Sequence, residues 1–182
     1  RLANLATGGD RSLTRTRLAT YVLLRRFEDV LAAANLRLRT MSSGRYELRR
    51  TDTEGGQRSR HAGLGLEVVD HQTSRPREPR TLSGGETFYV SLCLALGMVD
   101  IVRAEAGGVD LGTLLIDEGF GTLDAETLDT VMRELTRLRD AGRTVGIVSH
   151  VAELKQAVPE RIEVRHLSGR PGSTLSVTWM GG

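Results

Sequence analysis

The sequence predicts an α/β fold whose core is a parallel βαβ unit. Residues 113–117 (TLLID) and 144–149 (TVGIVS) are short apolar runs of the kind that forms buried parallel strands. The segment 125–141 between them is long enough for a crossover helix, which Asp124 can cap and Gly142 can end. The apolar residues of this segment repeat at helical spacing as Leu128, Val131, Met132, Leu135 and Leu138.

Size and composition are typical of one soluble globular domain, or of one lobe of a larger domain. The chain has 182 residues, of which 39% are hydrophobic and 26% charged. Its net charge of +2 does not by itself imply a polyanionic partner. No apolar run approaches the roughly 18 residues of a membrane span and no leader-like segment is present, so we expect a cytoplasmic protein without a membrane partner. The single cysteine, Cys93, excludes an internal disulfide and is expected to be a small core residue.

The other segments predict flanking helices and antiparallel strands. Residues 13 to about 40 are expected to form a helix, whose apolar spacing fits either a helix lying on a sheet or the root of a coiled coil. The repeating residues of that helix are Leu24, Phe27, Leu31, Ala34 and Leu38. We expect a second helix at 84–105, a short one at 151–157, strands at 45–50 and 63–70 joined by a polar loop at 51–62, an extended, mobile segment at 71–81, and a short antiparallel hairpin of 161–167 and 173–179.

Charged residues follow both strands of the predicted βαβ unit. Asp117 and Glu118 come at the end of the first strand and His150 follows the second. Parallel strands end at the same edge of a sheet, where open α/β sheets bind ligands, so these side chains are expected to meet there. Neighbouring strand residues point to opposite faces, which would separate Asp117, suited to bind Mg²⁺, from Glu118, suited to act as a base.

Residues 82–86 (LSGGE) have the pattern of an anion-binding turn that opens a helix. Ser83 and Glu86 fit a capping box, and Gly84-Gly85 leave backbone N–H groups uncovered. An ordinary capped helix is the alternative. Two glycines in a first helical turn each cost about 1 kcal/mol relative to alanine, so we favour the close approach of a phosphate. Lys155 is the only lysine and has no glycine near it, which excludes a P-loop.

These segments together resemble the ABC ATPases. LSGGE at 82–86 looks like the signature motif, TLLIDEGFGTLD at 113–124 looks like the Walker B strand followed by the D-loop, and VGIVSH at 145–150 looks like the switch-histidine strand. Within the superfamily, DEGFGTLD followed by ETL is similar to the SbcC family of SMC-like ATPases. RFEDVLAAANLRLRTMSSGRYEL at 26–48 is similar to the SbcC segment where the returning coiled coil enters the head.

The resemblance implies that the chain is the C-terminal lobe of an ABC-type ATPase head. Residues 1–40 would be the end of a coiled-coil arm or a linking helix, and residues 41–182 would be the lobe. The P-loop would lie on an N-terminal lobe of the same protein, so this lobe alone is expected to be inactive as an ATPase.

Roles for single residues also follow from the resemblance. Asp117 would hold Mg²⁺, while Glu118 as hydrolytic base and His150 as switch residue would be catalytic. ATP would be the nucleotide, held by the opposite head of a dimer. The residues expected to reach that nucleotide are Ser83, Gly84, Gly85, Glu86 and Asp124.

The partners implied are the N-terminal P-loop lobe, a second SbcC head, an SbcD-type nuclease subunit and double-stranded DNA, at the nucleoid. ATP would join two heads, and its hydrolysis would gate DNA access to the nuclease. A chromosome-organising SMC-type ATPase is the alternative, although GFGTLD differs from what SMC proteins usually have. A transporter nucleotide-binding domain fits less well because Glu86 stands where transporters usually have glutamine. The arginines of 45–60 and 75–80 are interpreted as solvated rather than DNA-binding.

Overall fold

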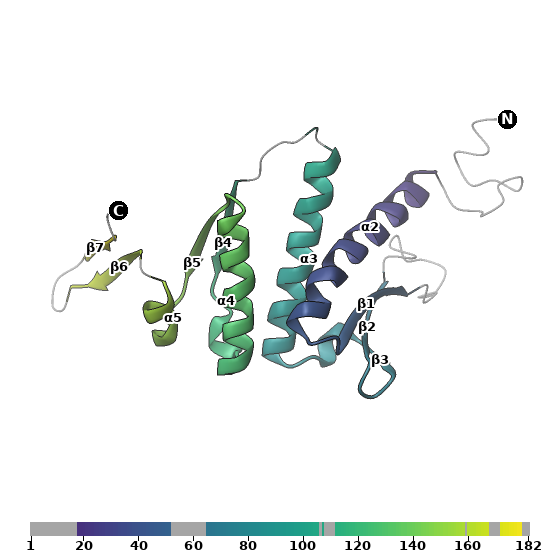
Figure 1. Ribbon diagram of the computed structural model, residues 1–182, viewed down its shortest axis with the longest axis horizontal. Helices are drawn as coiled ribbons and strands as arrows, with labels where there is room; N and C mark the ends of the chain where they lie inside the picture. Colours follow the sequence, from purple (N-terminus) through teal and green to yellow (C-terminus); the bar gives the residue numbers. More distant parts are fainter. Residues whose placement is uncertain are drawn as a thin grey trace, which may run out of the picture.

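The computed structural model describes residues 18–51, 65–105, 107, 112–158, 160–167 and 172–179. Its elements lie in a row, from a helix pair and a small sheet at one end to a β-hairpin at the other (Figure 1). In chain order they are α2 (Leu18–Met41), β1 (Tyr46–Thr51), β2 (Gly65–Asp70), β3 (Arg75–Arg77), η1 (Pro79–Thr81), α3 (Gly84–Glu105), β4 (Thr113–Asp117), η2 (Phe120–Thr122), α4 (Ala125–Asp140), β5 (Thr144–Val148), α5 (Ala152–Ala157), β6 (Arg161–His166) and β7 (Ser173–Thr178). The predicted α/β fold is confirmed, and residues 13–17 and 52–64, which belong to three predicted segments, lie outside the described residues.

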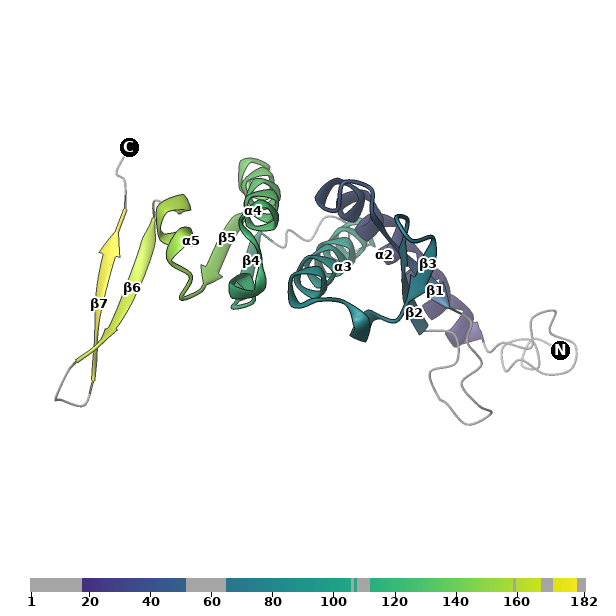
Figure 2. The ribbon, with the colours of Figure 1, turned by 90° about the horizontal axis from the view of Figure 1, so that it is seen from below.

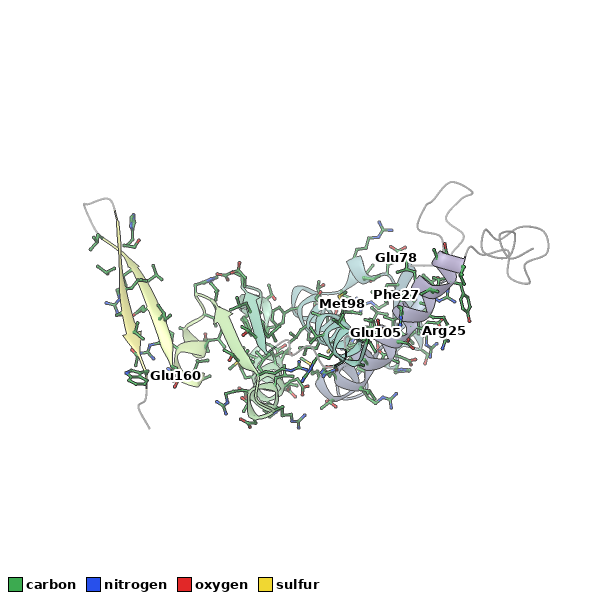
Figure 3. The ribbon with its side chains drawn as sticks, turned by 90° about the horizontal axis from the view of Figure 1, so that it is seen from above. Arg25, Phe27, Glu78, Met98, Glu105 and Glu160 are labelled. Atoms are coloured by element: carbon green, nitrogen blue, oxygen red, sulfur yellow. The ribbon has the colours of Figure 1, made fainter. Side chains whose placement is uncertain are left out.

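Helices α2 and α3 pack closely side by side (Figures 1 and 2). Of the predicted repeat on α2, Leu31, Ala34 and Leu38 are buried. Gly97 of α3 lies against the backbone of α2, since a Cβ built on it would be 2.8 Å from the Val30 carbonyl oxygen and 2.8 Å from the Ala34 nitrogen. The C-terminal half of α2 is therefore part of a helix pair in the core. At the far end of the pair, Glu105 of α3, which is labelled in Figure 3, forms an ion pair with Arg26 of α2.

A three-stranded antiparallel sheet, in the order β1-β2-β3, lies beside this helix pair (Figure 2). In the segment 71–81, predicted to be extended and mobile, Arg75–Arg77 form the edge strand β3 and Pro79–Thr81 form the 3₁₀ helix η1, while its mobility stays a prediction. Pro76 is compatible with β3 because an edge strand leaves one side of its backbone unpaired. The Arg45 guanidinium, whose Nη2 lies 3.0 Å from Asp70 Oδ2, lowers the pKa of that buried carboxyl below its ordinary value.

Strands β4 and β5 pair in parallel and α4 connects them, as predicted. The stripe on α4 packs into the core through Val131, Leu135 and Leu138. The prediction that both strands are buried is wrong for the described chain, because no residue of β4 or β5 is buried. The side chains that pack against the core are half-buried, and on the other face Leu115 is 73% exposed and Val148 is 56% exposed. Helix α4 supplies cover on a single face, and the other face of this sheet is open in the described chain.

A cluster of ion pairs links the helix pair to the β4–α4–β5 unit. Arg37 of α2 contacts Asp100 of α3 at 2.6 Å and Glu134 of α4 at 3.6 Å. Arg143, in the turn before β5, lies 3.4 Å from the second carboxylate oxygen of Asp100. These side chains are mostly covered, so the pairs are screened less by water than surface pairs are. They tie three helices together at the sides away from solvent.

The C-terminal hairpin of β6 and β7 is confirmed, with antiparallel pairing of Ile162 with Val177 and of Val164 with Leu175. Because paired residues share a face, these four side chains form one apolar surface, and all are exposed. Polar side chains of β6 contact α5: Lys155 Nζ lies 3.6 Å from Glu163 Oε1, and Arg161 Nη1 donates a hydrogen bond to the Lys155 carbonyl oxygen at 3.2 Å.

Helix α3 is, among the described helices, the one long and apolar enough to cross a membrane by length and composition. No such helix was expected from the sequence. A core helix passes the same test, and Cys93, Leu96 and Gly97 of α3 are buried against the rest of the chain. In this structure α3 is the central helix of the core, and Cys93 has the expected place in it.

The close packing of α2 on α3 predicts that Gly97→Ala destabilises the protein. Alanine is the better helix former by about 1 kcal/mol. Its Cβ would, however, clash with backbone atoms of α2, which cannot move away by changing a side-chain rotamer. We expect the free energy of unfolding to fall by about 1–3 kcal/mol, measured by chemical denaturation. Ser91→Ala, at an exposed position of the same helix, is the control and should cause no loss. A Gly97→Ala protein as stable as the parent would contradict the close approach of the two helices.

Candidate functional site

The C-terminal ends of β4 and β5 bring a carboxylate and an imidazole together, as predicted. His150 Nδ1 lies 3.1 Å from Oε2 and 3.3 Å from Oε1 of Glu118. Both side chains are exposed. Asp117, the last residue of β4, is also exposed, and its side chain has no hydrogen-bond or ion-pair partner among the described residues. The edge of the sheet therefore presents the Glu118 carboxylate, paired with His150, next to the Asp117 carboxylate, which has no partner among the described residues.

The backbone at Glu118 is in the left-handed region, with φ of 61°. Such a conformation costs a non-glycine residue about 1–2 kcal/mol, and the hydrogen bond from Glu118 N to Val148 O, 2.9 Å long, helps to hold it. Because β4 ends at Asp117, the pleat of the strand does not extend to Glu118. The two carboxylates are thus separated by a bend, and the alternation assumed from the sequence does not apply at this point. Strained backbone conformations of non-glycine residues are found more often at functional sites than elsewhere.

The turn at the start of α3 has the predicted capping box. Ser83 N donates to Oε2 of Glu86 at 2.8 Å, and Glu86 N donates to Ser83 Oγ at 3.2 Å. Thr87 N donates to the Ser83 carbonyl oxygen at 2.8 Å. The N–H groups of Gly84 and Gly85 have no hydrogen-bond partner within the described part of the chain. Two backbone donors thus remain free at a helix N-terminus, which is the usual setting for an anion.

The two glycines of the turn also have a reason within the chain. A Cβ on Gly84 would lie 3.0 Å from Thr122 Cβ, and a Cβ on Gly85 would lie 3.2 Å from the Thr122 carbonyl oxygen. Two glycines therefore do not by themselves require an approaching phosphate, because the loop after β4 already occupies the space beside them. The free N–H groups are the better indication of a ligand.

Asp124 caps α4, as predicted. Its Oδ1 accepts a hydrogen bond from Thr127 N at 2.8 Å and its Oδ2 accepts one from Thr127 Oγ1 at 3.0 Å. The backbone N–H of Thr127, followed by its hydroxyl, lowers the pKa of Asp124 below its ordinary value. The side chain is exposed, so it remains accessible while it caps the helix.

The start of α3 and the C-terminal ends of β4 and β5 all lie along the lower edge of the molecule as drawn in Figure 1. Phe88 of α3 connects them, because its ring lies 4.9 Å from that of Phe120 and fills the space beside Gly119. Thr122, Phe88 and Tyr46, whose hydroxyl reaches Glu86, were not among the predicted site residues. Their positions depend on tertiary contacts, for which the sequence carries no local signal.

Comparison with known proteins identifies relatives over most of the chain. A family model described as "SbcC/RAD50-like, Walker B motif" matches residues 40–137. The SbcC subunit of the nuclease SbcCD from Staphylococcus haemolyticus (strain JCSC1435) is 47% identical over 147 residues, which are 81% of this chain and 14% of the relative. The protein of the same name from Staphylococcus aureus (strain JH9) is 45% identical over 165 residues, which are 90% of this chain and 16% of the relative. The chain spans a small part of the length of these curated relatives.

Solved structures of SMC ATPases share the fold. One, from work on ATP-driven dimerization and DNA-stimulated activation of SMC ATPases, has a TM-score of 0.64 at 15% identity and covers 87% of this chain and 89% of that one. An Smc head bound to the C-terminal winged-helix domain of ScpA has a TM-score of 0.62 at 15% identity, covering 97% of this chain and 49% of that one. At this identity the likeness concerns the fold alone.

The cap on α4 predicts that Asp124→Ala lowers the thermal unfolding midpoint, whereas Asp124→Asn, which keeps a side-chain acceptor, lowers it less. Because the folded-state pKa of Asp124 is lowered, its ionised form stabilises the protein above the ordinary carboxyl pKa of about 4, and this contribution is lost as the pH falls through the lower, folded-state pKa. The difference between the parent and Asp124→Ala should therefore shrink in acid. Thermal melts from neutral to acidic pH test this, and a difference independent of pH would contradict it.

Proposed function

Because this chain belongs to the SbcC/RAD50-like family, we propose that it is the C-terminal ATPase lobe of an SbcC-type protein that acts on DNA. ATP bound between two heads would hold them together, and its hydrolysis would release them and gate DNA access to a nuclease partner. The observation that carries this proposal is the pair of free N–H groups on Gly84 and Gly85, in a chain that has no P-loop lysine of its own.

Glu118 is proposed as the base that orients the attacking water. His150 is proposed to stabilise negative charge on the terminal phosphate by donating a hydrogen bond. Their contact at 3.1 Å supports a shared site, since a base and a hydrogen-bond donor within reach of one phosphate must lie close together. His150 holds the Glu118 carboxylate at the edge of the sheet until a nucleotide offers His150 another acceptor.

Asp117 is proposed to hold Mg²⁺. Among the described residues there is no group of three or more His, Cys, Asp or Glu side chains that could form a complete metal site. One exposed carboxylate without a protein partner fits Mg²⁺, which is commonly bound by one or two carboxylates, substrate phosphates and water. When bound, the ion would neutralise charge on the phosphate oxygens.

Ser83, Gly84, Gly85 and Asp124 are proposed to reach the nucleotide held by the opposite head. The free donors of Gly84 and Gly85 point out of a helix N-terminus, where the helix dipole adds to their attraction for an anion. Ser83 Oγ is engaged by Glu86 N at 3.2 Å, so we expect this hydroxyl to turn towards a phosphate when one is present. Glu86 belongs to the same turn, where its carboxylate accepts the hydrogen bond from Ser83 N.

An N-terminal P-loop lobe of the same protein is the proposed first partner. Parallel sheets are usually covered on both faces, yet the face of β4–β5 that carries Leu115 and Val148 is open. A two-stranded hairpin such as β6–β7 is marginal without cover on its apolar side. The chain spans 14% to 16% of its relatives, so the remainder of such a protein can supply this cover.

A second head, a nuclease subunit and double-stranded DNA complete the proposed partners. The relatives are named as subunits of a nuclease, which supports an SbcD-type partner. Residues 1–40 are proposed to end a coiled-coil arm, and α2 supports this because Leu18, Tyr21, Val22 and Leu23 at its start are exposed apolar residues. Arg45, Arg49, Arg77 and Arg80 all form ion pairs with carboxylates, so no DNA contact is assigned to them.

A chromosome-organising ATPase of the SMC kind is the second candidate, which the likeness to SMC heads favours at the level of fold. Co-purification separates the two functions. The full-length protein should bring down a metallophosphoesterase nuclease subunit if it acts as SbcC does, and its failure to do so would favour the SMC function.

The role of Glu118 predicts that Glu118→Gln in the full-length protein traps an ATP-bound head dimer. Glutamine keeps the size of the side chain but cannot accept a proton, so ATP would bind and persist. We expect ATP turnover to fall by about a hundredfold or more and dimers to survive gel filtration with ATP. Glu126→Gln, at an exposed position of α4, is the control and should dissociate like the parent. Glu118→Gln dimers that separate as fast as the parent would argue against Glu118 as the base.

A further inference from the structure

The carboxylate of Glu86 is held at both oxygens by groups of this chain. Oε2 accepts the hydrogen bond from Ser83 N at 2.8 Å and lies 3.8 Å from Arg77 Nη1. Oε1 accepts a hydrogen bond from the hydroxyl of Tyr46 at 2.5 Å. Both oxygens of Glu86 are thereby engaged by groups of this chain, whereas the N–H groups of Gly84 and Gly85 have no partner among the described residues.

Tyr46 is well placed to fix Glu86. Its side chain is 3% exposed, packs against Tyr89 of α3 with ring centroids 6.1 Å apart, and has the Arg45 guanidinium over its ring. Tyr46 begins β1, which Asn35 of α2 holds through hydrogen bonds to both backbone groups of Leu48, at 2.9 Å to its carbonyl oxygen and 2.8 Å from its nitrogen. The hydroxyl therefore comes from a rigid strand attached to α2.

At neutral pH the Tyr46 hydroxyl is the donor and the Glu86 carboxylate is the acceptor in this hydrogen bond. Burial, and then the hydrogen bond to Glu86, raise the pKa of Tyr46 to about 12, so its hydroxyl remains a donor at neutral pH. Burial alone raises the pKa of Glu86, but the hydrogen bonds from Tyr46 and Ser83 and the charge of Arg77 together lower the pKa below its ordinary value. Glu86 is therefore an ionised acceptor throughout the neutral range.

We propose that Tyr46 is a positioning residue for the phosphate-binding turn, which it acts on through Glu86. Held by Tyr46, Glu86 keeps the N–H of Ser83 closed inside the turn and leaves those of Gly84 and Gly85 as the ones that face a phosphate. This inference rests on the proposed function and assigns Glu86 the role of shaping the turn instead of contacting the nucleotide. It also connects α2, through β1, to the turn that joins two heads.

The test uses the full-length Glu118→Gln protein, whose ATP-dependent dimer is the readout. Tyr46→Phe removes one hydroxyl that bonds to a charged group, so the ATP concentration for half-maximal dimer formation should rise about tenfold. ATP binding to separate heads, measured at protein concentrations too low for dimers, should not change. Thr136→Val, which removes a hydroxyl at an exposed position of α4, is the control and should have no effect.

A double-mutant cycle shows whether Tyr46 acts through Glu86. Glu86→Ala should weaken dimer formation, and Tyr46→Phe should add nothing further in the Glu86→Ala protein, because the group it positions is gone. Glu86→Gln, which keeps the size but presents an amide N–H, is a second variant and should weaken the dimer in the same way. Additive losses, or a Tyr46→Phe protein that dimerises like its reference, would overturn this proposal alone. A Glu118→Gln protein that never dimerises with ATP would instead overturn the proposed function, and the positioning role with it.

Discussion

The contact between the start of α3 and the loop after β4 is the link on which the rest of this structure depends. The helix pair and the sheet of β1–β3 lie on one side of it, and β4, α4 and β5 lie on the other (Figures 1 and 2). Gly84 lets Thr122 approach the first turn of α3, while Phe88 covers Gly119 and packs on Phe120 at 4.9 Å between centroids. The turn at residues 83–86 and the Glu118–His150 pair both lie next to this contact.

Features that depend on near neighbours in the chain could be predicted from the sequence, and those that depend on distant neighbours could not. The capping box of Ser83 and Glu86 lies within a single helical turn, so the spacing of the two residues in the sequence was enough to predict it. The parallel pairing of β4 and β5 followed from two apolar runs around a helix. The left-handed bend at Glu118 and the contact of Tyr46 with Glu86 had no local signal, because packing imposes both. The two apolar runs predicted buried strands. In the described chain the face that carries Leu115 and Val148 has no cover, so the strands are not buried.

The two groups of candidate residues are each part of a site. The edge of the β4–β5 sheet offers two carboxylates and an imidazole, but no lysine that would hold the phosphates of a nucleotide. The turn at α3 offers free backbone donors, but no group that would cleave a bond. In the proposed head dimer, a nucleotide lying between two heads would use both, with Glu118 from one head and the turn from the other. The open faces of the β4–β5 sheet and of the β6–β7 hairpin likewise call for further polypeptide.

Complementation between two inactive full-length proteins tests this arrangement most directly. One protein carries Ser83→Arg, which blocks the turn, and the other carries Glu118→Gln, which removes the base; the two bear different tags and are combined before ATP is added. A mixed dimer has one site with both an intact base and an intact turn only if these come from opposite heads. We expect no ATP turnover from either protein alone and clear turnover from the co-purified mixture. A mixed dimer that forms but shows no ATP turnover would contradict this arrangement.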